Sequence, residues 1–241
     1  MRAETRHQLK QDRFSRATID VAEKTVDWSV EHQKKLTIAG VVVLVLAVLG
    51  VGGWYYLQQQ DEKASVQFSQ AVRTLDTPVR PANMPPQPDQ PSFASSQERA
   101  TAAHKQFQVI VDKYPLTHAA DFAHYFLGMT STDMGDNAAA ERELQKVAAY
   151  RNADLAALAR FALASVYRNT NRNKQAIDLY NQLIAKPTAT VPKATAQIEL
   201  AATYQSANQP MEAKRIYEQI QKENPASEVA QMASQKLQAL Q

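Results

Sequence analysis

Three residues with metal-binding side chains follow one another at a spacing of three: His118, Asp121 and His124. Imidazole and carboxylate groups are common zinc ligands, so this spacing raises the question of a metal site. On a helix, however, residues six apart point about 120° away from each other, because one turn takes 3.6 residues. We therefore expect His124 to occupy a core position of its helix, and we predict no metal site here.

No other motif indicates catalysis. The chain has no cysteine, which excludes thiol catalysis, iron–sulfur clusters and Cys-ligated zinc. It contains no H-E-x-x-H, G-x-S-x-G or P-loop pattern. Residues 58–241 carry 19 Lys and Arg against 18 Asp and Glu, so we expect no nucleic-acid partner. The prediction is a non-enzymatic protein with no cofactor and no small-molecule substrate; an enzyme whose site goes unrecognised is the alternative.

An uncharged segment follows the first 35 residues and covers residues 36–57, with the sequence LTIAGVVVLVLAVLGVGGWYYL. About 20 apolar residues cross the hydrocarbon core of a bilayer as a helix. Lys34 and Lys35 precede the segment, and three aromatic residues from Trp54 to Tyr56 end it, as the positive-inside rule and interfacial aromatic belts predict. We predict one transmembrane helix with a cytoplasmic N-terminus. A cleaved signal peptide and a buried core helix are the alternatives.

The predicted cytoplasmic tail, residues 1–35, has a helical pattern of its own. Apolar or small residues recur every four positions, at Phe14, Thr18, Ala22, Val26 and Val30. This spacing places one apolar stripe on a helix. Such a helix would lie on the membrane surface or bind a partner, and a weakly helical, solvated tail is the alternative.

Three segments beyond the span align without gaps, and their starts at Asp121, Ala157 and Ala194 are 36 and 37 residues apart. Each has a Leu followed by a small residue, an Ala twelve residues later and a large side chain four further on. In order, these are Gly128, Ala164 and Ala201; Ala140, Ala176 and Ala213; and Leu144, Tyr180 and Tyr217. The small residues would let two helices approach closely, and the rings would fill the space to the next pair of helices.

This pattern resembles the tetratricopeptide repeat. The resemblance implies an all-α fold, in which a single N-terminal transmembrane helix precedes about four helical hairpins and a C-terminal capping helix at 226–240. Residues 58–76 are the predicted first repeat helix, continuous with the span, with apolar positions at Val66, Phe68, Ala71, Val72 and Leu75. Residues 77–93 are a Pro-rich insert, which we expect to be extended and exposed, and residues 94–241 hold the remaining repeats and the cap.

In tetratricopeptide arrays, fixed positions of the first helix in each hairpin line a concave groove. Carried onto this sequence, the resemblance implies a protein-binding groove that includes Phe122, Tyr125, Met129, Leu158, Phe161, Arg168, Asn169, Ile198 and Gln205. Its apolar and aromatic members suit an extended or helical apolar peptide. The alternative is that these side chains pack against the chain itself, on the Pro-rich insert or on the helix after the span.

A cytoplasmic tail, one anchor and an exported repeat array together resemble the ancillary subunits of the Sec translocon. These are bacterial inner-membrane proteins with one span and a periplasmic tetratricopeptide-like domain. The resemblance covers about residues 20–241 and implies protein partners: the translocon, periplasmic chaperones and exported chains. The Pro-rich insert and the length of the tail depart from the pattern. The alternative is a scaffold that binds cell-envelope or division proteins through the groove.

Overall fold

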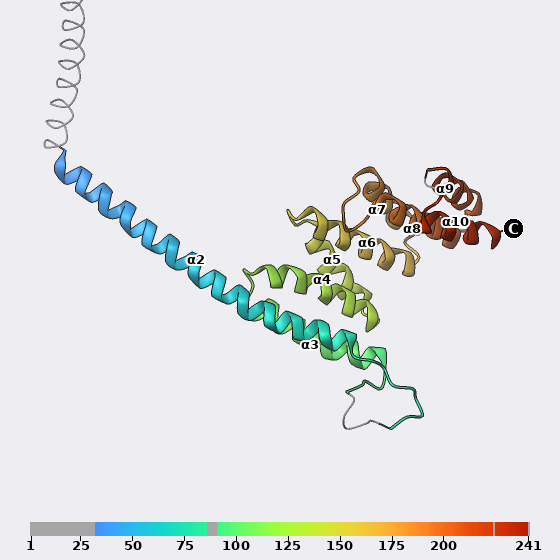
Figure 1. Cartoon of the computed structure of the whole chain (residues 1–241), viewed down its shortest axis with the longest axis horizontal. Coiled ribbons are helices and arrows are strands. Elements are labelled where there is room, and N and C mark those ends of the chain that lie inside the picture. The colour runs from blue at the N-terminus through green and yellow to red at the C-terminus, as the bar shows by residue number, and fades with distance from the viewer. Residues whose placement is uncertain (1–31, 86–90, 224, 241) are drawn as a thin grey trace, which may run out of the picture. The chain divides into compact units, whose positions relative to one another are not determined.

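The computed structural model describes residues 32–85, 91–223 and 225–240. In these ranges the chain forms helices, most of which are joined by short connections, with one isolated bridge between Val79 and Phe93 (Figure 1). The predicted all-α class is confirmed. The predicted stripe from Phe14 to Val30 lies outside the described residues. Contacts divide the chain into two compact units, residues 1–58 and 59–241.

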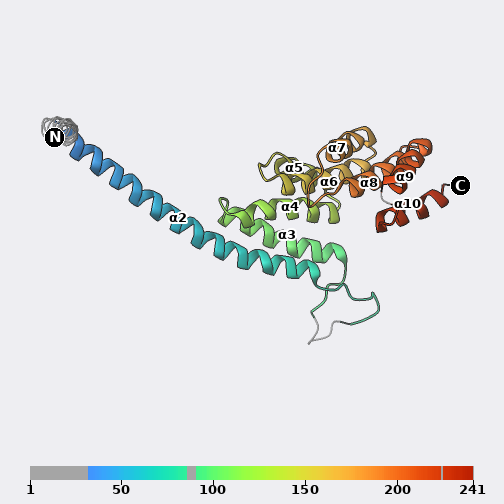
Figure 2. The same cartoon turned by 45° about the horizontal axis from the view of Figure 1, so that its top comes forward.

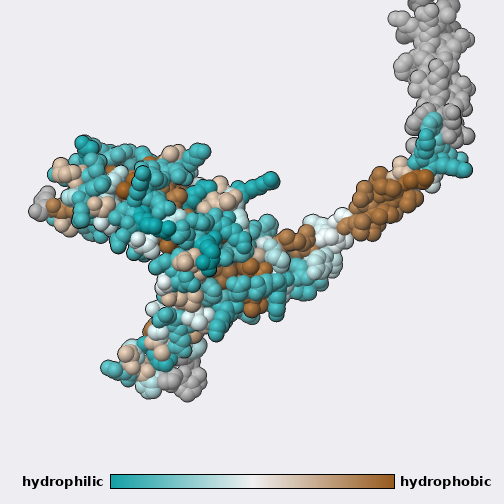
Figure 3. Space-filling model, turned by 180° about the vertical axis from the view of Figure 1, so that it is seen from behind, coloured by the Kyte–Doolittle hydropathy of each residue, from teal (hydrophilic) through white to brown (hydrophobic). Residues whose placement is uncertain are grey.

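Helix α2 runs from Gln33 to Asp76 without a break. Large side chains of its apolar segment are exposed, among them Ile38 at 65% and Leu49 at 66%, and Figure 3 shows them as a brown band. None of its most apolar stretch is buried within the described residues, unlike a helix in the core of a domain. The helix is long and apolar enough to cross a membrane.

The hairpins follow the predicted spacing, and each helix packs against the next one along the chain (Figures 1 and 2). They pair α4 (His118–Asp133) with α5 (Asn137–Ala148), α6 (Ala153–Asn169) with α7 (Asn173–Ala185), and α8 (Lys193–Ser206) with α9 (Pro210–Glu223). Before them, α3 (Ser96–Lys113) packs against the C-terminal part of α2. The predicted tetratricopeptide-like array is therefore confirmed.

Small residues form the contact between the two helices of each hairpin, as predicted. The five alanines of the pattern are fully buried: Ala140, Ala164, Ala176, Ala201 and Ala213. At Gly128, a Cβ atom would lie only 2.6 Å from Cγ of Leu144. The α4–α5 hairpin therefore has no room for a side chain at this position.

The turns that follow α4, α6 and α8 each place one residue in the left-handed backbone region, with φ of 83° at Gly135, 59° at Asn171 and 56° at Asn208. The following N–H group donates to a carbonyl five residues earlier, over 2.9 Å for Asp136 to Ser131, 2.8 Å for Arg172 to Tyr167 and 2.8 Å for Gln209 to Tyr204. This closure satisfies a carbonyl at the end of α4, α6 and α8. Gly and Asn occupy the position because they tolerate a positive φ.

The first hairpin has a core of its own, built from α2, α3 and α4. Ala64 and Ala71 of α2 are fully buried against Phe107 of α3, and Phe68 packs beside them. Val66, by contrast, is 61% exposed, because it lies on the opposite side of α2 from these residues. The prediction that Val66 belongs to the apolar face is therefore wrong.

Helix α10 (Glu228–Gln238) closes the far end of the array. Its buried Ala233, with the half-buried Leu237, packs against Tyr217 and Ile220 of α9. The predicted capping helix is confirmed, and it covers apolar surface that the last hairpin would otherwise expose.

Candidate protein-binding groove

The predicted groove residues lie on α4, α6 and α8, the first helices of three successive hairpins. Phe122, at the start of α4, is 39% exposed, and its ring centroid lies 6.2 Å from that of Phe68 on α2. Phe68 also contacts Phe107 and Phe126, at 5.6 and 5.5 Å. Phe122 therefore packs in part on the helix after the apolar segment, which was one of the two self-packing alternatives.

Four further apolar groove residues are half-buried, namely Tyr125, Met129, Leu158 and Phe161. All pack on the central core, and the ring of Phe161 lies 5.6 Å from that of the buried Tyr180. Burial raises the pKa of the Tyr125 hydroxyl above its ordinary value of 10.0. These side chains offer part of their surface to a partner while they also stabilise the array.

The two polar groove residues on α6 differ in their contacts with the rest of the chain. The Nη1 atom of Arg168 lies 2.6 Å from Oε2 of Glu199 on α8, so this guanidinium joins two successive repeats. Asn169, the next residue, is exposed. The sequence reasoning missed Glu199, because the pair depends on how two repeats stack. A partner would meet Arg168 with its charge already balanced.

The two predicted residues on α8 both contact α9 of the array itself. Ile198 is 8% exposed and packs against Tyr217 in the C-terminal core. The Oε1 atom of Gln205 accepts a hydrogen bond of 3.1 Å from the Tyr217 hydroxyl. The described surface that remains for a partner therefore lies mainly on α4 and α6.

Phe68 of α2 occupies the same repeat position as three of the predicted groove residues, and these residues form one row on the first helices. Phe68 precedes the buried Ala71 by three residues, and the other members precede the corresponding small residue by the same distance: Tyr125 before Gly128, Phe161 before Ala164 and Ile198 before Ala201. The signal was present in the sequence as a Phe three residues before an Ala. The insert after residue 76 hid it, because it interrupts the repeat period.

Both ring nitrogens of His124, one of the residues that raised the question of a metal, have partners on α5. The Nδ1 atom of His124 lies 2.7 Å from Oε2 of Glu143, and its Nε2 lies 3.3 Å from Nζ of Lys146. The backbone N–H of His118 donates to Oδ1 of Asp61 over 2.9 Å. Across residues 32–85, 91–223 and 225–240, no group of three His, Cys, Asp or Glu is placed to hold a metal ion.

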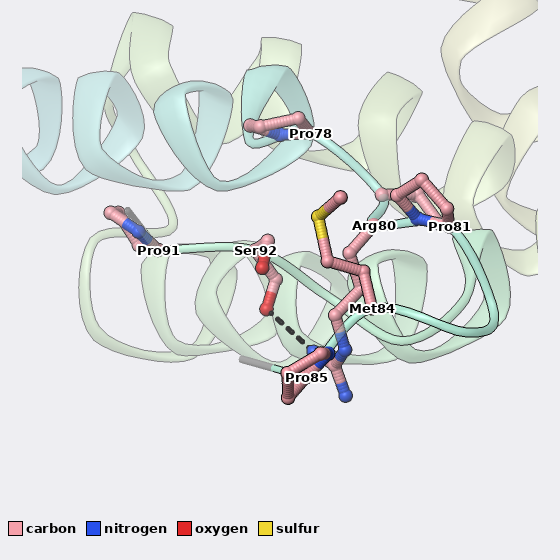
Figure 4. Close-up of a pocket in the computed structure, with 8 residues that line it drawn as sticks. Pro78, Arg80, Pro81, Met84, Pro85, Pro91 and Ser92 are labelled. Atoms are coloured by element: carbon pink, nitrogen blue, oxygen red, sulfur yellow. Dashed lines mark hydrogen bonds between the residues drawn. The ribbon is translucent and has the colours of Figure 1, made fainter. Parts of the chain in front are cut away.

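The Pro-rich insert folds back on itself at its base. The Arg80 N–H donates to the Phe93 carbonyl over 2.9 Å, and the Phe93 N–H donates to that of Pro78 over 3.1 Å. The Arg80 side chain also donates to the Ser92 carbonyl, drawn dashed in Figure 4, over 3.1 Å. Arg99 of α3 donates to the carbonyl of Thr77 over 3.2 Å. These bonds close the neck of a loop at the base of the insert. The alternative in which the insert packs on the groove stays a prediction.

A small apolar cavity of about 170 Å³ lies within this loop (Figure 4). Its lining includes Pro78, Pro81, Met84, Pro85 and Pro91. The prediction of an extended insert is therefore incomplete, since the described part has a closed neck and a hollow of its own.

Comparisons with known proteins agree with this geometry. The tetratricopeptide repeat-like domain family matches residues 26–182, and the tetratricopeptide repeat matches residues 195–227. Among curated proteins, no sequence matches the chain.

Two crystal structures are similar to this chain. Both are of nearly identical TPR-like repeats from Podosopora anserina, described as those of a kinesin light chain, and one of them is a variant with a single substitution. Each is 16% identical to this chain, with a TM-score of 0.57. The alignments cover 75% of this chain and 86% or 85% of the other. At this identity the likeness concerns the fold alone.

Tetratricopeptide repeats are protein-interaction modules, and the hairpins described above supply such a module here. The family match covers well over half of the 241 residues and includes α3 to α6. This chain belongs to the tetratricopeptide repeat-like domain family.

Proposed function

We propose that this protein is a membrane-anchored, non-enzymatic binding module at the Sec translocon, which helps to hand exported chains to periplasmic chaperones. In this proposal residues 36–57 span the bacterial inner membrane once, the N-terminus is cytoplasmic and the repeat array is periplasmic. The observation that carries it is a partly exposed apolar row on the first helices of the repeats, in a chain whose α2 also exposes an apolar segment of membrane-spanning length.

The anchoring part rests on α2. An exposed apolar surface of this size is costly in water, and in a bilayer it faces lipid instead. Helical hydrogen bonding satisfies the backbone of the segment internally, as the hydrocarbon core requires. Lys34 and Lys35 at its start favour the proposed orientation.

The binding part rests on the row formed by Phe68, Phe122, Tyr125, Met129 and Phe161. Each is half-buried or 39% exposed and held by neighbouring rings or by core packing, so little side-chain entropy is lost when a partner binds. Because Arg168 is already paired with Glu199, the partner is recognised by apolar groups rather than by charge. Apolar segments of unfolded, exported chains have this chemistry.

Affinity capture of the full chain in mild detergent tests the proposal. We expect translocon subunits and periplasmic chaperones to be captured by the wild type. The variant Phe122→Lys with Asn169→Lys changes the two predicted groove residues with the most exposed side chains, and it should lose the soluble partners while keeping the translocon.

The matched control is Leu116→Lys with Met211→Lys. These two side chains are 80% and 70% exposed, and both lie outside the row of first helices. The control should capture what the wild type captures. Loss of the same partners in both variants would contradict the groove, because the effect would then follow surface charge alone.

A second variant replaces residues 36–57 with an unrelated apolar span. If the native span contacts the translocon, this variant keeps its membrane location and loses the translocon subunits. Recovery of envelope or division proteins without the translocon would favour the scaffold function instead. The closed loop of the Pro-rich insert gives that function a second binding surface.

A further inference from the structure

An exposed apolar side chain lies in the turn between the first and second hairpins, at residues 114–117. Leu116 is 80% exposed, the largest fraction among the large apolar side chains of the described ranges. The carbonyl of Tyr114 accepts a hydrogen bond from the N–H group of Thr117, over 3.2 Å, and another from its hydroxyl, over 2.8 Å. The backbone of the turn is therefore fixed and keeps Leu116 on the surface. A single exposed leucine is ordinary, so its meaning depends on where the turn lies.

The turn lies at the end of the first hairpin that is nearest to the apolar segment of α2. Four hydrogen bonds join the C-terminal part of α2 and the residue after it to the following chain. In order along α3, they are Thr77 with Arg99, Thr74 with Gln106, Gln67 with Tyr114, and Asp61 with His118. The residue numbers fall on α2 as they rise on the partner, so α3 runs back along α2 (Figure 2). The turn therefore ends beside Asp61.

Asp61 is only four residues from Leu57, the last residue of the uncharged segment 36–57. Four residues reach at most about 14 Å when extended, and about 6 Å along a helix such as α2. The headgroup layer adds about 5–7 Å to each side of the hydrocarbon core of a bilayer. With residues 36–57 in a bilayer, Asp61 lies near the outer edge of the headgroup layer, and the turn beside it is within reach of lipid.

The polar groups around Leu116 permit contact with a lipid surface. The carboxylates of Asp61 and Asp112 already accept hydrogen bonds, over 2.9 Å from the His118 N–H group and over 2.9 Å from Nε2 of Gln108. Lys113, at the end of α3, is exposed. A lysine can pair with lipid phosphate while its aliphatic stem lies along apolar groups. An exposed leucine beside a lysine is a combination typical of segments that lie in the membrane interface.

We propose that the turn at residues 114–117 is a second membrane contact of this protein, with Leu116 inserted between the lipid headgroups. This contact rests on the anchoring part of the proposed function, because it needs residues 36–57 to span a bilayer. The span has already brought the turn to the membrane, so the contact is intramolecular and one apolar side chain can make it. It holds the start of α4, which carries Phe122, next to the lipid surface. The candidate groove then begins at the membrane.

A fluorescent probe on a single cysteine tests the contact, because the natural chain has no cysteine. The full chain is reconstituted in vesicles of phosphatidylethanolamine and phosphatidylglycerol, with an environment-sensitive fluorophore on Leu116→Cys. Met211→Cys is the matched control, since Met211 is a large apolar side chain that is 70% exposed and lies on α9. We expect the emission at position 116 to shift to shorter wavelength. Lipids with a nitroxide on the headgroup should quench it several-fold more strongly than the emission at position 211.

A second probe position keeps Leu116 in place. His118 is the first residue of α4 and is exposed, so a fluorophore on His118→Cys reports on the turn from its other side. Quenching of this probe should fall several-fold when Leu116→Asn is added, and it should be unchanged with Leu116→Ile, which stays apolar. Because Leu116 is so exposed, neither change should disturb the fold, and circular dichroism checks this.

Flotation of the vesicles separates this contact from the anchoring on which it rests. If the chain does not float with the vesicles, the anchoring is wrong and the second contact is overturned with it. If the chain floats and the probe at position 116 is quenched no more than the probe at position 211, the anchoring stands and only the second contact is overturned. Equal quenching at position 118 with Leu116 and with Leu116→Asn overturns it as well. In detergent there is no bilayer, so Leu116→Lys remains a control for partner capture.

Discussion

At Gly128 the missing side chain is what allows two helices to approach. Glycine in a helix interior is ordinarily less favourable than alanine by about 1 kcal/mol, because its backbone loses more freedom. Here that cost is accepted because Cγ and Cδ2 of Leu144 occupy the space, 2.6 and 2.8 Å from where a Cβ atom would lie. At the corresponding positions of the next two hairpins stand Ala164 and Ala201, where the helices leave room for one methyl group.

The sign of the Gly128→Ala effect tests this packing. In the wild-type background we expect a loss of about 1–3 kcal/mol in the free energy of unfolding, because Leu144 must shift in a filled core. In a Leu144→Ala background the same change should stabilise the protein by about 0.5–1 kcal/mol, since the helix propensity of alanine is then unopposed. Urea denaturation of the four proteins gives the coupling energy. Destabilisation of equal size in both backgrounds would show that Leu144 is not the cause.

At the scale of the element, a left-handed residue lies two positions after the end of α4, α6 and α8. Asn171 and Asn208 occupy the place that Gly135 has in the preceding hairpin, and all three precede the N–H group that closes the turn. The steric cost of a positive φ for other residues is about 1–2 kcal/mol.

Asn171→Ala is therefore expected to lower the free energy of unfolding by about 1 kcal/mol, whereas Asn171→Gly should leave it within a few tenths. Asn181→Ala, at an exposed position inside α7, serves as the control and should be neutral or slightly stabilising. Thermal and urea unfolding of the three variants measure the difference. Equal losses at Asn171 and Asn181 would point to a general loss of Asn hydrogen bonds instead.

The hairpins and the capping helix could be predicted because their spacing is local and repeats along the chain. Contacts between repeats could not, because they depend on how successive hairpins stack. Arg168 and Glu199 are 31 residues apart and meet across α6 and α8, and Ile198 is buried by the helices that follow it. Phe68 was predicted as an apolar position but not as a groove residue, because the insert moves the first hairpin out of the repeat period.

At the scale of the whole array, a polar cluster joins the second repeat to the third. The Glu141 carboxylate of α5 accepts from Arg172 over 2.6 and 3.2 Å, from the Tyr167 hydroxyl over 3.1 Å and from Gln145 over 2.9 Å. The Arg172 guanidinium also lies 4.2 Å from the centre of the Tyr167 ring. A single carboxylate thus ties α5 to the turn between α6 and α7.

This cluster predicts a pH dependence in the acid range. Hydrogen bonds from Arg172, more than any other cause, lower the pKa of Glu141. A carboxyl group with a lowered pKa stabilises the folded array above its ordinary value of 4.5, and this contribution is lost as pH falls below it.

We expect Glu141→Gln to be less stable than the wild type at neutral pH by about 1 kcal/mol or less, since Arg172 is 37% exposed and partly screened. The difference should shrink below pH 4.5. Glu212→Gln, which breaks an exposed pair with Arg215 within one helix, is the control and should change stability little at any pH. Urea unfolding at several pH values measures both. A constant difference for Glu141→Gln would exclude the carboxylate as the titrating group.

The closed neck of the Pro-rich insert has a consequence for how this protein can change. Because Pro78, Arg80 and Phe93 already hold the two ends of the loop together, the hairpin of α2 and α3 does not depend on the length of chain between them. Each doubling of that length adds only about 0.6 kcal/mol of loop-closure entropy. The loop beyond the neck is thus a natural insertion point, at which evolution or an experimenter can exchange residues, or place a tag, while the repeat array keeps its fold.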